Sequence, residues 1–272
     1  MIMAEEVVSI QVSKLEASLE KLLAPDAGEW GGVEEAVVPI DPTPLERLPS
    51  AYVQVSWRDR PRGAIGEVRV RAASGAGGLA VRLDWAAPRP SRLISDLNVY
   101  PDACAMLFPA DGREAEFDSM GSPKHPVQGW HWRAGTDLPF VVTATGIGTV
   151  ERAKEHPVQV RARWSEGRWQ VVLAGPLGAG GMPLRKGSGL PVAFGVWSGA
   201  ARERAGLKSY SPQACKLRVC WLEEASDEGC KGGVRGCDGR DASVREGGRA
   251  VHGAGLSVLQ GGVHARGEAD GR

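Results

Sequence analysis

The sequence predicts an all-β protein, an antiparallel β-sandwich with short helical and loop insertions. Three observations predict it. Glycine (37) and proline (18) are frequent, and nine tryptophans outnumber four phenylalanines and three tyrosines. Short apolar runs alternate with turn residues along most of the chain, without the βα alternation of a parallel sheet. About nine strands at this spacing are typical of a sandwich or barrel.

The predicted strands are recognised by length, apolar content and flanking turns. In the stretch VQVRARW the apolar residues Val158, Val160, Ala162 and Trp164 share one face, as period-2 alternation requires. The following WSEGRW predicts a hairpin with its turn at Glu166. The full set of predicted strands is Ala51–Trp57, Ile65–Arg71, Leu79–Trp85, Ala103–Phe108, Gln128–Arg133, Val158–Trp164, Trp169–Ala174, Val192–Trp197 and Cys215–Trp221.

Two further stretches set the domain organisation. Lys14–Leu23 is the one good amphipathic pattern and predicts a short helix. Residues 223–272 hold thirteen glycines and no aromatic residue, so they cannot bury enough apolar surface to offset the entropy of ordering. We therefore expect one sandwich domain over residues 1–222 and a glycine-rich, disordered tail over 223–272.

Composition excludes several classes of function. Thirty-three basic residues balance thirty-three acidic ones, which argues against a nucleic-acid-binding protein. No window of about 18 apolar residues predicts a transmembrane helix. The first residues lack the basic and apolar regions of a secretory signal, which favours a cytoplasmic protein.

Catalytic and metal-binding patterns are missing from the sequence. We find no GxGxxG after a strand, no phosphate-binding loop, no GxSxG and no HExxH. His125, His131 and His156 form no HxH or HxxxH pair, and the five cysteines have irregular spacing without CxxC. The residues alone predict a sandwich without recognisable catalysis.

Two segments are richer in distinctive residues than the rest: FDSMGSPKHPVQGWHWRA, which contains Met120, and PVAFGVWSGAARERAGLKSYS, which contains Lys208. On residue type alone, core packing is the better explanation for Met120, and a solvated loop is the better one for Lys208. Nine tryptophans also suggest another class of function, a carbohydrate-binding module that uses exposed tryptophans as stacking platforms.

The order of segments over residues 20–221 resembles the haem b-binding gamma subunit of the type II dimethyl sulfoxide reductase family of molybdoenzymes. That family includes ethylbenzene and dimethylsulfide dehydrogenases and chlorate, selenate and nitrate reductases. The resemblance is carried, in this order, by LLAPDAGEWGGVEEAVVPIDPTPL, LAVRLDWAAP, PDACAMLFP, MGSPKHPVQGWHWRA, EGRWQVVLAGPL and PVAFGVWSGAARERAGLKSYS.

The resemblance implies a β-sandwich that is not itself an enzyme but carries one non-covalent haem b for electron transfer. Its methionine and lysine ligands to the iron match Met120 and Lys208, and a neutral lysine amine requires burial. Trp130 and Trp132 lie on one face of a strand, either against the haem or in the core. His125 and His131 are rival ligands because they are close to Met120 in sequence.

Partners and location follow from the same resemblance. It implies a molybdopterin catalytic subunit, an iron–sulfur subunit, and an external cytochrome or membrane redox partner. It also implies a periplasmic or extracytoplasmic location, in conflict with the missing signal peptide. Position 208 is followed by CKLRVCWL, which fits a final strand, whereas the tail to Arg272 has no counterpart in the family.

Overall fold

The computed structural model describes residues 7–94, 97–136, 138–178, 181–184 and 189–219. All of these residues belong to one compact unit, Met1–Cys230. The predicted tail, 223–272, lies outside the described residues, as do Cys220 and Trp221.

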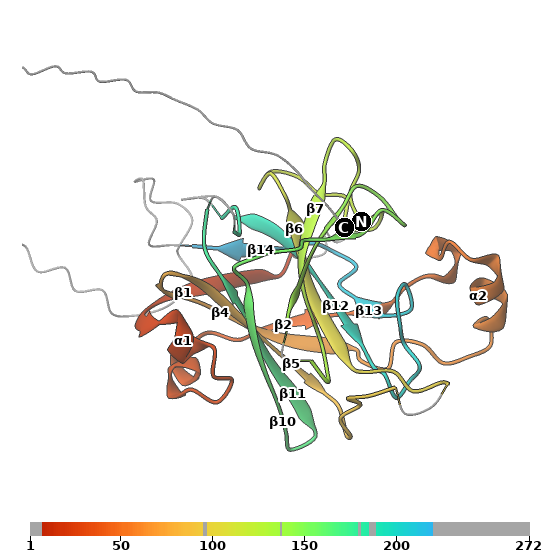
Figure 1. Cartoon of the computed structure of the whole chain (residues 1–272), viewed down its shortest axis with the longest axis horizontal. Coiled ribbons are helices and arrows are strands. Elements are labelled where there is room, and N and C mark those ends of the chain that lie inside the picture. Colours follow the sequence, from red (N-terminus) through yellow and green to blue (C-terminus); the bar gives the residue numbers. More distant parts are fainter. Residues whose placement is uncertain (1–6, 95–96, 137, 179–180, 185–188, 220–272) are drawn as a thin grey trace, which may run out of the picture. The chain divides into compact units, whose positions relative to one another are not determined.

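The Met1–Cys230 unit is a β-sandwich built from one curled sheet, as the sequence predicted (Figure 1). One half of the sheet, the first layer, runs in the order β10-β11-β5-β4 with β2 beside β4; the other half, the second layer, runs β14-β12-β6-β7-β8-β9 with β13 beside β12 and β3 beside β13. The first-layer strands are β2 (Ala36–Pro39), β4 (Glu67–Ala76), β5 (Gly78–Ala86), β10 (Gln159–Ser165) and β11 (Arg168–Gly175). The second-layer strands are β3 (Asp41–Pro42), β6 (Ala103–Pro109), β7 (Val127–Arg133), β8 (Phe140–Ala144), β9 (Glu151–Arg152), β12 (Leu190–Trp197), β13 (Ser209–Tyr210) and β14 (Cys215–Arg218).

Strand β1 (Ser9–Ser18) joins the two layers. Its first part, from Ser9, pairs with β14 and its second part, from Val12, pairs with β4, both in parallel. The predicted helix Lys14–Leu23 was therefore wrong for its first half: the chain stays extended to Ser18, and only α1 (Leu19–Leu22) is helical. Pairing on two edges outweighs the helical preference of this stretch, because tertiary contacts override local propensity.

The predicted strand Ala51–Trp57 was also wrong. It forms helix α2 (Ala51–Ser56), and the Ser50 hydroxyl accepts a hydrogen bond from the Val53 amide at 3.4 Å. A serine at this position satisfies one of the unpaired amides of a helix start. Short 3₁₀ turns, η1 (Gly28–Gly32) and η2 (Leu45–Arg47), complete the helical insertions. No helix in the described ranges is long and apolar enough to span a bilayer.

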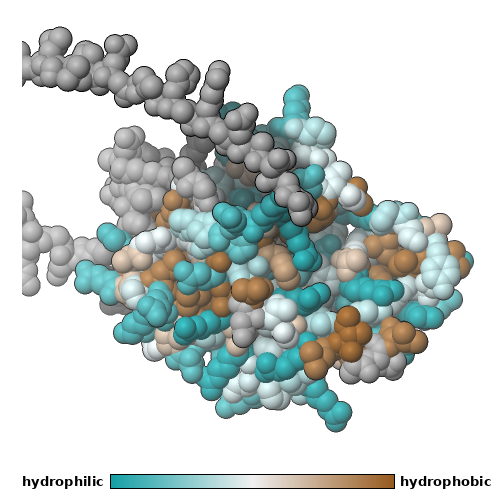
Figure 2. Space-filling model, viewed as in Figure 1, coloured by the Kyte–Doolittle hydropathy of each residue, from teal (hydrophilic) through white to brown (hydrophobic). Residues whose placement is uncertain are grey.

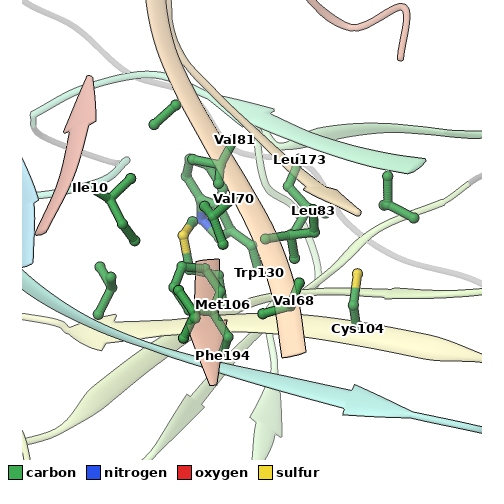
Figure 3. Close-up of a cluster of buried hydrophobic side chains, with 14 of the residues drawn as sticks. Ile10, Val68, Val70, Val81, Leu83, Cys104, Met106, Trp130, Leu173 and Phe194 are labelled. Carbon is green, nitrogen blue, oxygen red and sulfur yellow. The ribbon is translucent and has the colours of Figure 1, made fainter. Parts of the chain in front are cut away.

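The core lies between the layers and consists of the inward half of each strand's alternating residues (Figure 3). Val70, Leu83 and Leu173 come from the first layer, and Met106 and Trp130 from the second; all are buried. Burial of such side chains from both layers is the main favourable term for the fold. Three tryptophans, Trp85, Trp132 and Trp169, also meet here, with ring centroids 4.9–6.5 Å apart.

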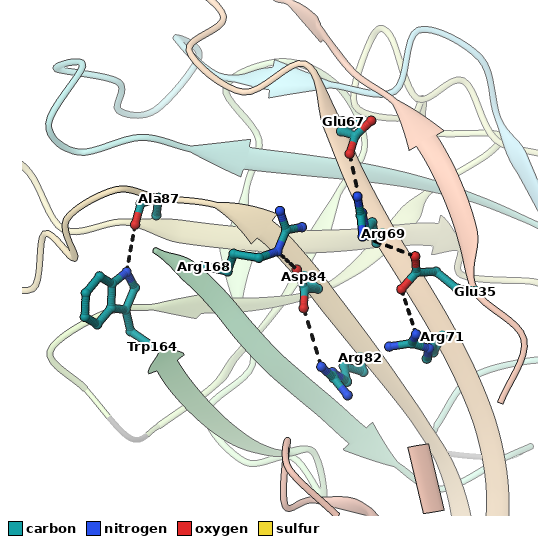
Figure 4. Close-up of polar contacts among 9 residues, drawn as sticks. All are labelled: Glu35, Glu67, Arg69, Arg71, Arg82, Asp84, Ala87, Trp164 and Arg168. Atoms are coloured by element: carbon teal, nitrogen blue, oxygen red, sulfur yellow. Dashed lines mark hydrogen bonds and ion pairs between the residues drawn. The ribbon is translucent and has the colours of Figure 1, made fainter. Parts of the chain in front are cut away.

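The outer face of the first layer carries charged side chains (Figure 4). Asp84 accepts hydrogen bonds from Arg168 at 2.5 Å and Arg82 at 3.4 Å, and Glu35 pairs with Arg71 at 2.9 Å. Charged side chains therefore alternate with core side chains along these strands, as the pleat requires. On the face drawn in Figure 2, hydrophilic side chains surround separate hydrophobic patches.

Candidate functional site

The outer face of the second layer forms the floor of a cavity of about 470 Å³. Because side chains alternate along a strand, the residues between the core positions point to this face. Several of them are small, which leaves room above the sheet: Ala105 on β6, and Ala193 and Gly195 on β12. The remaining floor residues are Leu107, His131, Phe140, Val142 and Trp197.

Four segments form the walls. They are the segment from Thr43 to Pro49, the segment from Phe117 to Met120, the loop from Ile147 to Val150, and the chain from Ala205 to Tyr210. Most lining side chains are apolar, and the volume is in the range of sites that bind small ligands or cofactors. The cavity thus collects segments that are far apart in the sequence.

Met120 lines this cavity, in a backbone conformation that is rare for a residue with a side chain. Its φ is +60°, and the next residue, Gly121, has φ +82°. Hydrogen bonds hold it on both sides: its amide donates to the Phe117 carbonyl at 3.1 Å, and its carbonyl accepts from the Gly146 amide at 3.1 Å. Residues held in sparsely populated conformations concentrate at functional sites, because the surroundings must fix them there.

Lys208 lines the same cavity. Its aliphatic chain passes over Gly195, where an added Cβ would come within 3.3 Å of the lysine Cδ, and its Nζ lies 5.6 Å from the centre of the Trp197 ring. The Lys208 carbonyl accepts hydrogen bonds from the Thr43 amide at 2.9 Å and hydroxyl at 3.1 Å. Burial lowers the pKa of this amine, since an apolar environment disfavours its charged form.

His131 is the second basic group of the cavity. It lies on the floor between the rings of Phe140 and Trp197, with centroid distances of 5.7 and 5.2 Å. Burial, and then the positive charges of Arg152 and Arg133, lower the pKa of His131 to about 4. Its buried Nδ1 has no hydrogen-bond partner among the described residues. His131 therefore carries no charge near neutral pH.

His125 is not in the cavity lining, although it is closer to Met120 in sequence than His131 is. It closes a tight turn in which its amide donates to the Ser122 carbonyl at 3.1 Å. Of the two histidines considered from the sequence, the structure brings only His131 to the cavity. The described residues contain no group of three or more histidines, cysteines or acids that could hold a metal ion.

Trp130 and Trp132 do not line the cavity. They are 1% and 2% exposed, and they point from β7 into the core, on the opposite side of the strand from His131. Trp130 packs edge-on against Phe108 at 5.8 Å, and Trp132 against Trp169 at 4.9 Å. The core interpretation of these two residues, and not the cofactor-contact interpretation, agrees with the structure.

Charged side chains stand at one edge of the cavity. The Arg47 guanidinium pairs with the Asp118 carboxylate at 2.7 Å and donates to the Tyr210 hydroxyl at 2.9 Å. Arg152 lies 4.1 Å from the centre of the Phe140 ring. The sequence analysis did not identify these charged residues or the small residues of the cavity floor.

One sequence pattern could have indicated the small floor residues: Ala193 and Gly195 alternate with large apolar residues in the predicted strand Val192–Trp197.

Three curated proteins are similar to this chain. It is 30% identical over 205 residues to a respiratory nitrate reductase haem subunit of Haloferax mediterranei, a match that covers 72% of this chain and 70% of the relative. It is 31% identical over 156 residues to the chlorate reductase subunit gamma of Ideonella dechloratans, covering 56% of this chain and 64% of the relative.

The third relative is the dimethylsulfide dehydrogenase subunit gamma of Rhodovulum sulfidophilum, 26% identical over 197 residues, with 69% of this chain and 71% of the relative covered. The chain belongs to the gamma-subunit family of type II dimethyl sulfoxide reductase-like molybdoenzymes. This agrees with the resemblance seen in the sequence.

Two other comparisons add little to the assignment to this gamma-subunit family. No protein-family model matches the chain. A family 9 carbohydrate-binding module from Caldicellulosiruptor kristjanssonii aligns over 82% of this chain and 99% of its own, with 9% identity and a TM-score of 0.43. At these values the likeness has no bearing on what the chain binds.

Proposed function

We propose that this chain is a non-catalytic electron-transfer subunit that holds one haem b in the cavity, with Met120 and Lys208 as axial ligands. The observation that carries the proposal is that these two residues, from distant parts of the sequence, line one largely apolar cavity. The names of the relatives, a haem subunit and two gamma subunits of redox complexes, support the cofactor and the role.

The residues present suit a haem. The cavity floor is formed by small, aliphatic and aromatic residues and is largely apolar, and a thioether is a known axial ligand that raises the potential of the iron. The amine of Lys208 can donate its lone pair only when it is unprotonated, and its burial favours that form. When bound, haem supplies one-electron chemistry; the chain's own residues bind it, orient it and exclude water.

The partners and location follow as part of the same proposal. The chain would join a molybdopterin catalytic subunit and an iron–sulfur subunit and exchange electrons with an external carrier. We place the complex in the periplasm or another extracytoplasmic compartment, as in the family that the sequence resembles.

Titration of the purified chain with haem tests the ligands. The wild-type protein should give a low-spin, six-coordinate spectrum, and Met120→Ala and Lys208→Ala should each convert it to a five-coordinate or high-spin form, because each removes one ligand. Lys216→Ala is the matched control, since Lys216 is an exposed lysine on β14. An unchanged spectrum in both cavity variants would overturn the ligand assignment. Conversion by His131→Ala with no effect of Lys208→Ala would assign the second ligand to His131.

The carbohydrate-binding alternative has less support. Of the described tryptophans, Trp30, Trp85, Trp130, Trp132 and Trp169 are buried, and Trp57, Trp164 and Trp197 are partly buried. Within the described ranges no tryptophan is exposed as a stacking platform. Binding of oligosaccharides without Soret absorbance after haem addition would favour this alternative.

A further inference from the structure

Four exposed arginines lie close to the cavity wall that carries Lys208. Arg58 and Arg60 follow helix α2, and Arg202 and Arg204 lie in the loop after β12. We call these four residues the arginine surface. The whole chain has no net charge, so this grouping is a local excess of positive charge.

The buried carboxylate of Glu203 brings the two segments together. It accepts hydrogen bonds from the Gly63 amide at 3.1 Å and the Ala64 amide at 3.2 Å, and from the Ser198 amide at 2.8 Å. Glu203 is only 3% exposed, and its oxygens point to backbone amides. Its charge therefore acts inside the protein and leaves Arg202 and Arg204 beside it without a carboxylate partner.

None of the four arginines forms an ion pair with a described residue. Arg60 lies over the Trp57 ring at 5.7 Å, and Arg204 over the Tyr100 ring at 4.6 Å. These rings hold the Arg60 and Arg204 guanidiniums in place but leave their N–H groups free to bind carboxylates. Asp59 is the exposed acid within this group of residues.

The arginine surface lies directly outside the cavity wall. Trp57, Arg62, Glu203, Leu207 and Lys208 enclose one small gap, so the segments that bear the four arginines contact the residues around Lys208. Figure 1 shows α2 on the same side of the unit as β12 and β13. A partner bound at this surface would approach the cavity through the wall that carries Lys208.

We propose that the arginine surface is the docking site of the external electron carrier, and that this carrier is a redox protein with an acidic surface around its own cofactor. The proposal rests on the proposed function and adds the place and the charge of the partner. In each encounter one electron passes between the subunit's haem and the carrier's cofactor, so that one is oxidised as the other is reduced, and no proton or bond is exchanged. Complementary charge raises the rate of encounter by about 10- to 1,000-fold at low salt.

The test is stopped-flow oxidation of the reduced, haem-loaded chain by an acidic c-type cytochrome at low and high ionic strength. Combined Arg58→Glu, Arg60→Glu, Arg202→Glu and Arg204→Glu should lower the second-order rate constant about 10-fold or more and remove its decrease with salt. The matched control is Arg161→Glu with Arg218→Glu, two exposed arginines on β10 and β14 that likewise form no ion pair with a described residue. The control should stay within about twofold of the wild type.

Two further measurements keep this test decisive. A basic c-type cytochrome should react faster with the four-fold variant than with the wild type. If the four reversals together unfold the chain, reversal of Arg58 and Arg60 alone, or of Arg202 and Arg204 alone, should each lower the rate constant for the acidic cytochrome by a smaller factor. Equal slowing by the control pair, or wild-type rates after reversal, would overturn the docking site.

Calorimetric titration of the acidic cytochrome into the chain without haem separates this proposal from the proposed function. Binding that the four reversals abolish supports the docking site even if no haem binds. Absence of that binding in the wild type overturns the docking site even if the haem spectrum is as expected.

Discussion

At the scale of single residues, the cavity is distinguished by two half-buried basic groups, Lys208 and His131. Burial lowers the pKa of both, which keeps the His131 imidazole uncharged near neutral pH and favours the uncharged form of the Lys208 amine. Neither group gains a carboxylate partner among the described residues that would restore its charge. An uncharged nitrogen can donate its lone pair to a metal centre, and a protonated one cannot. We therefore expect the affinity of the cavity for a metal-containing cofactor to fall as pH falls.

His131 should make the stability of the unloaded chain depend on pH. Its pKa is about 4 in the folded chain and 6.5 in the unfolded one, so only the unfolded state takes up a proton as pH falls between these values. The contribution of His131 to the free energy of unfolding is fully present above pH 6.5. It decreases as pH falls towards 4, by at most about 3 kcal/mol.

Urea denaturation at about pH 7.5 and pH 5 measures this effect. His131→Gln should lose less stability between the two pH values than the wild type loses, whereas His156→Gln, outside the cavity, should keep the wild-type difference. A His131→Gln variant with the full wild-type decrease would contradict the assignment.

At the scale of elements, β1 is the most consequential strand because it pairs with β14 of the second layer and β4 of the first. Ile10 on this strand is fully buried in the core between the layers. Ile10→Ala should therefore lower the free energy of unfolding by about 2–5 kcal/mol, through lost burial and the cavity left behind.

The urea midpoint of Ile10→Ala checks this value against Val37→Ala, a truncation on β2 at a side chain that is 48% exposed. The control should change stability by less than about 0.5 kcal/mol. Equal effects in the two variants would mean that β1 does not anchor the layers.

Most strands could be predicted from the sequence because each alternates apolar and polar residues between turn residues. The predicted strands from Ile65 to Ala174 and Val192–Trp197 correspond, within a few residues, to β4, β5, β6, β7, β10, β11 and β12, and Cys215–Trp221 to β14 as far as it is described. Elements decided by long-range pairing could not be predicted: β1 has a helical composition, and β8 is short. The prediction for Ala51–Trp57 failed for the opposite reason: its alternating valines resemble a strand, but the segment is the helix α2, which Ser50 caps.

At the scale of the whole molecule, the cavity could not be derived from spacing. Met120, His131 and Lys208 line one cavity because β12, β6 and β7 are neighbours in the second layer. This strand order is a property of the complete sheet. Family resemblance pointed to Met120 and Lys208, and period-2 spacing placed Trp130 and Trp132 on one face of a strand. The spacing could not say that this face is the core, which is why those two residues are not part of the cavity.

The proposed division of the chain can be tested by truncation. A chain that ends at residue 222 keeps every strand that the structure describes and every residue that lines the cavity. It should therefore bind haem with the same spectrum and unfold at the same urea concentration as the full chain. The control is the full chain, purified in parallel. Loss of haem binding after truncation would show that residues 223–272 contribute to the site.

The pairing of β1 with β14 has a consequence for how the protein is made. These are the first and last strands of the described part, and they lie edge to edge. During synthesis, the edge of β1 that pairs with β14 stays unpaired until nearly the whole domain has been made, because β14 is synthesised last among the described strands. Contacts between such distant segments slow folding and leave an open sheet edge exposed meanwhile. The strand order thus leaves the edge of β1 without its β14 neighbour in any incomplete chain.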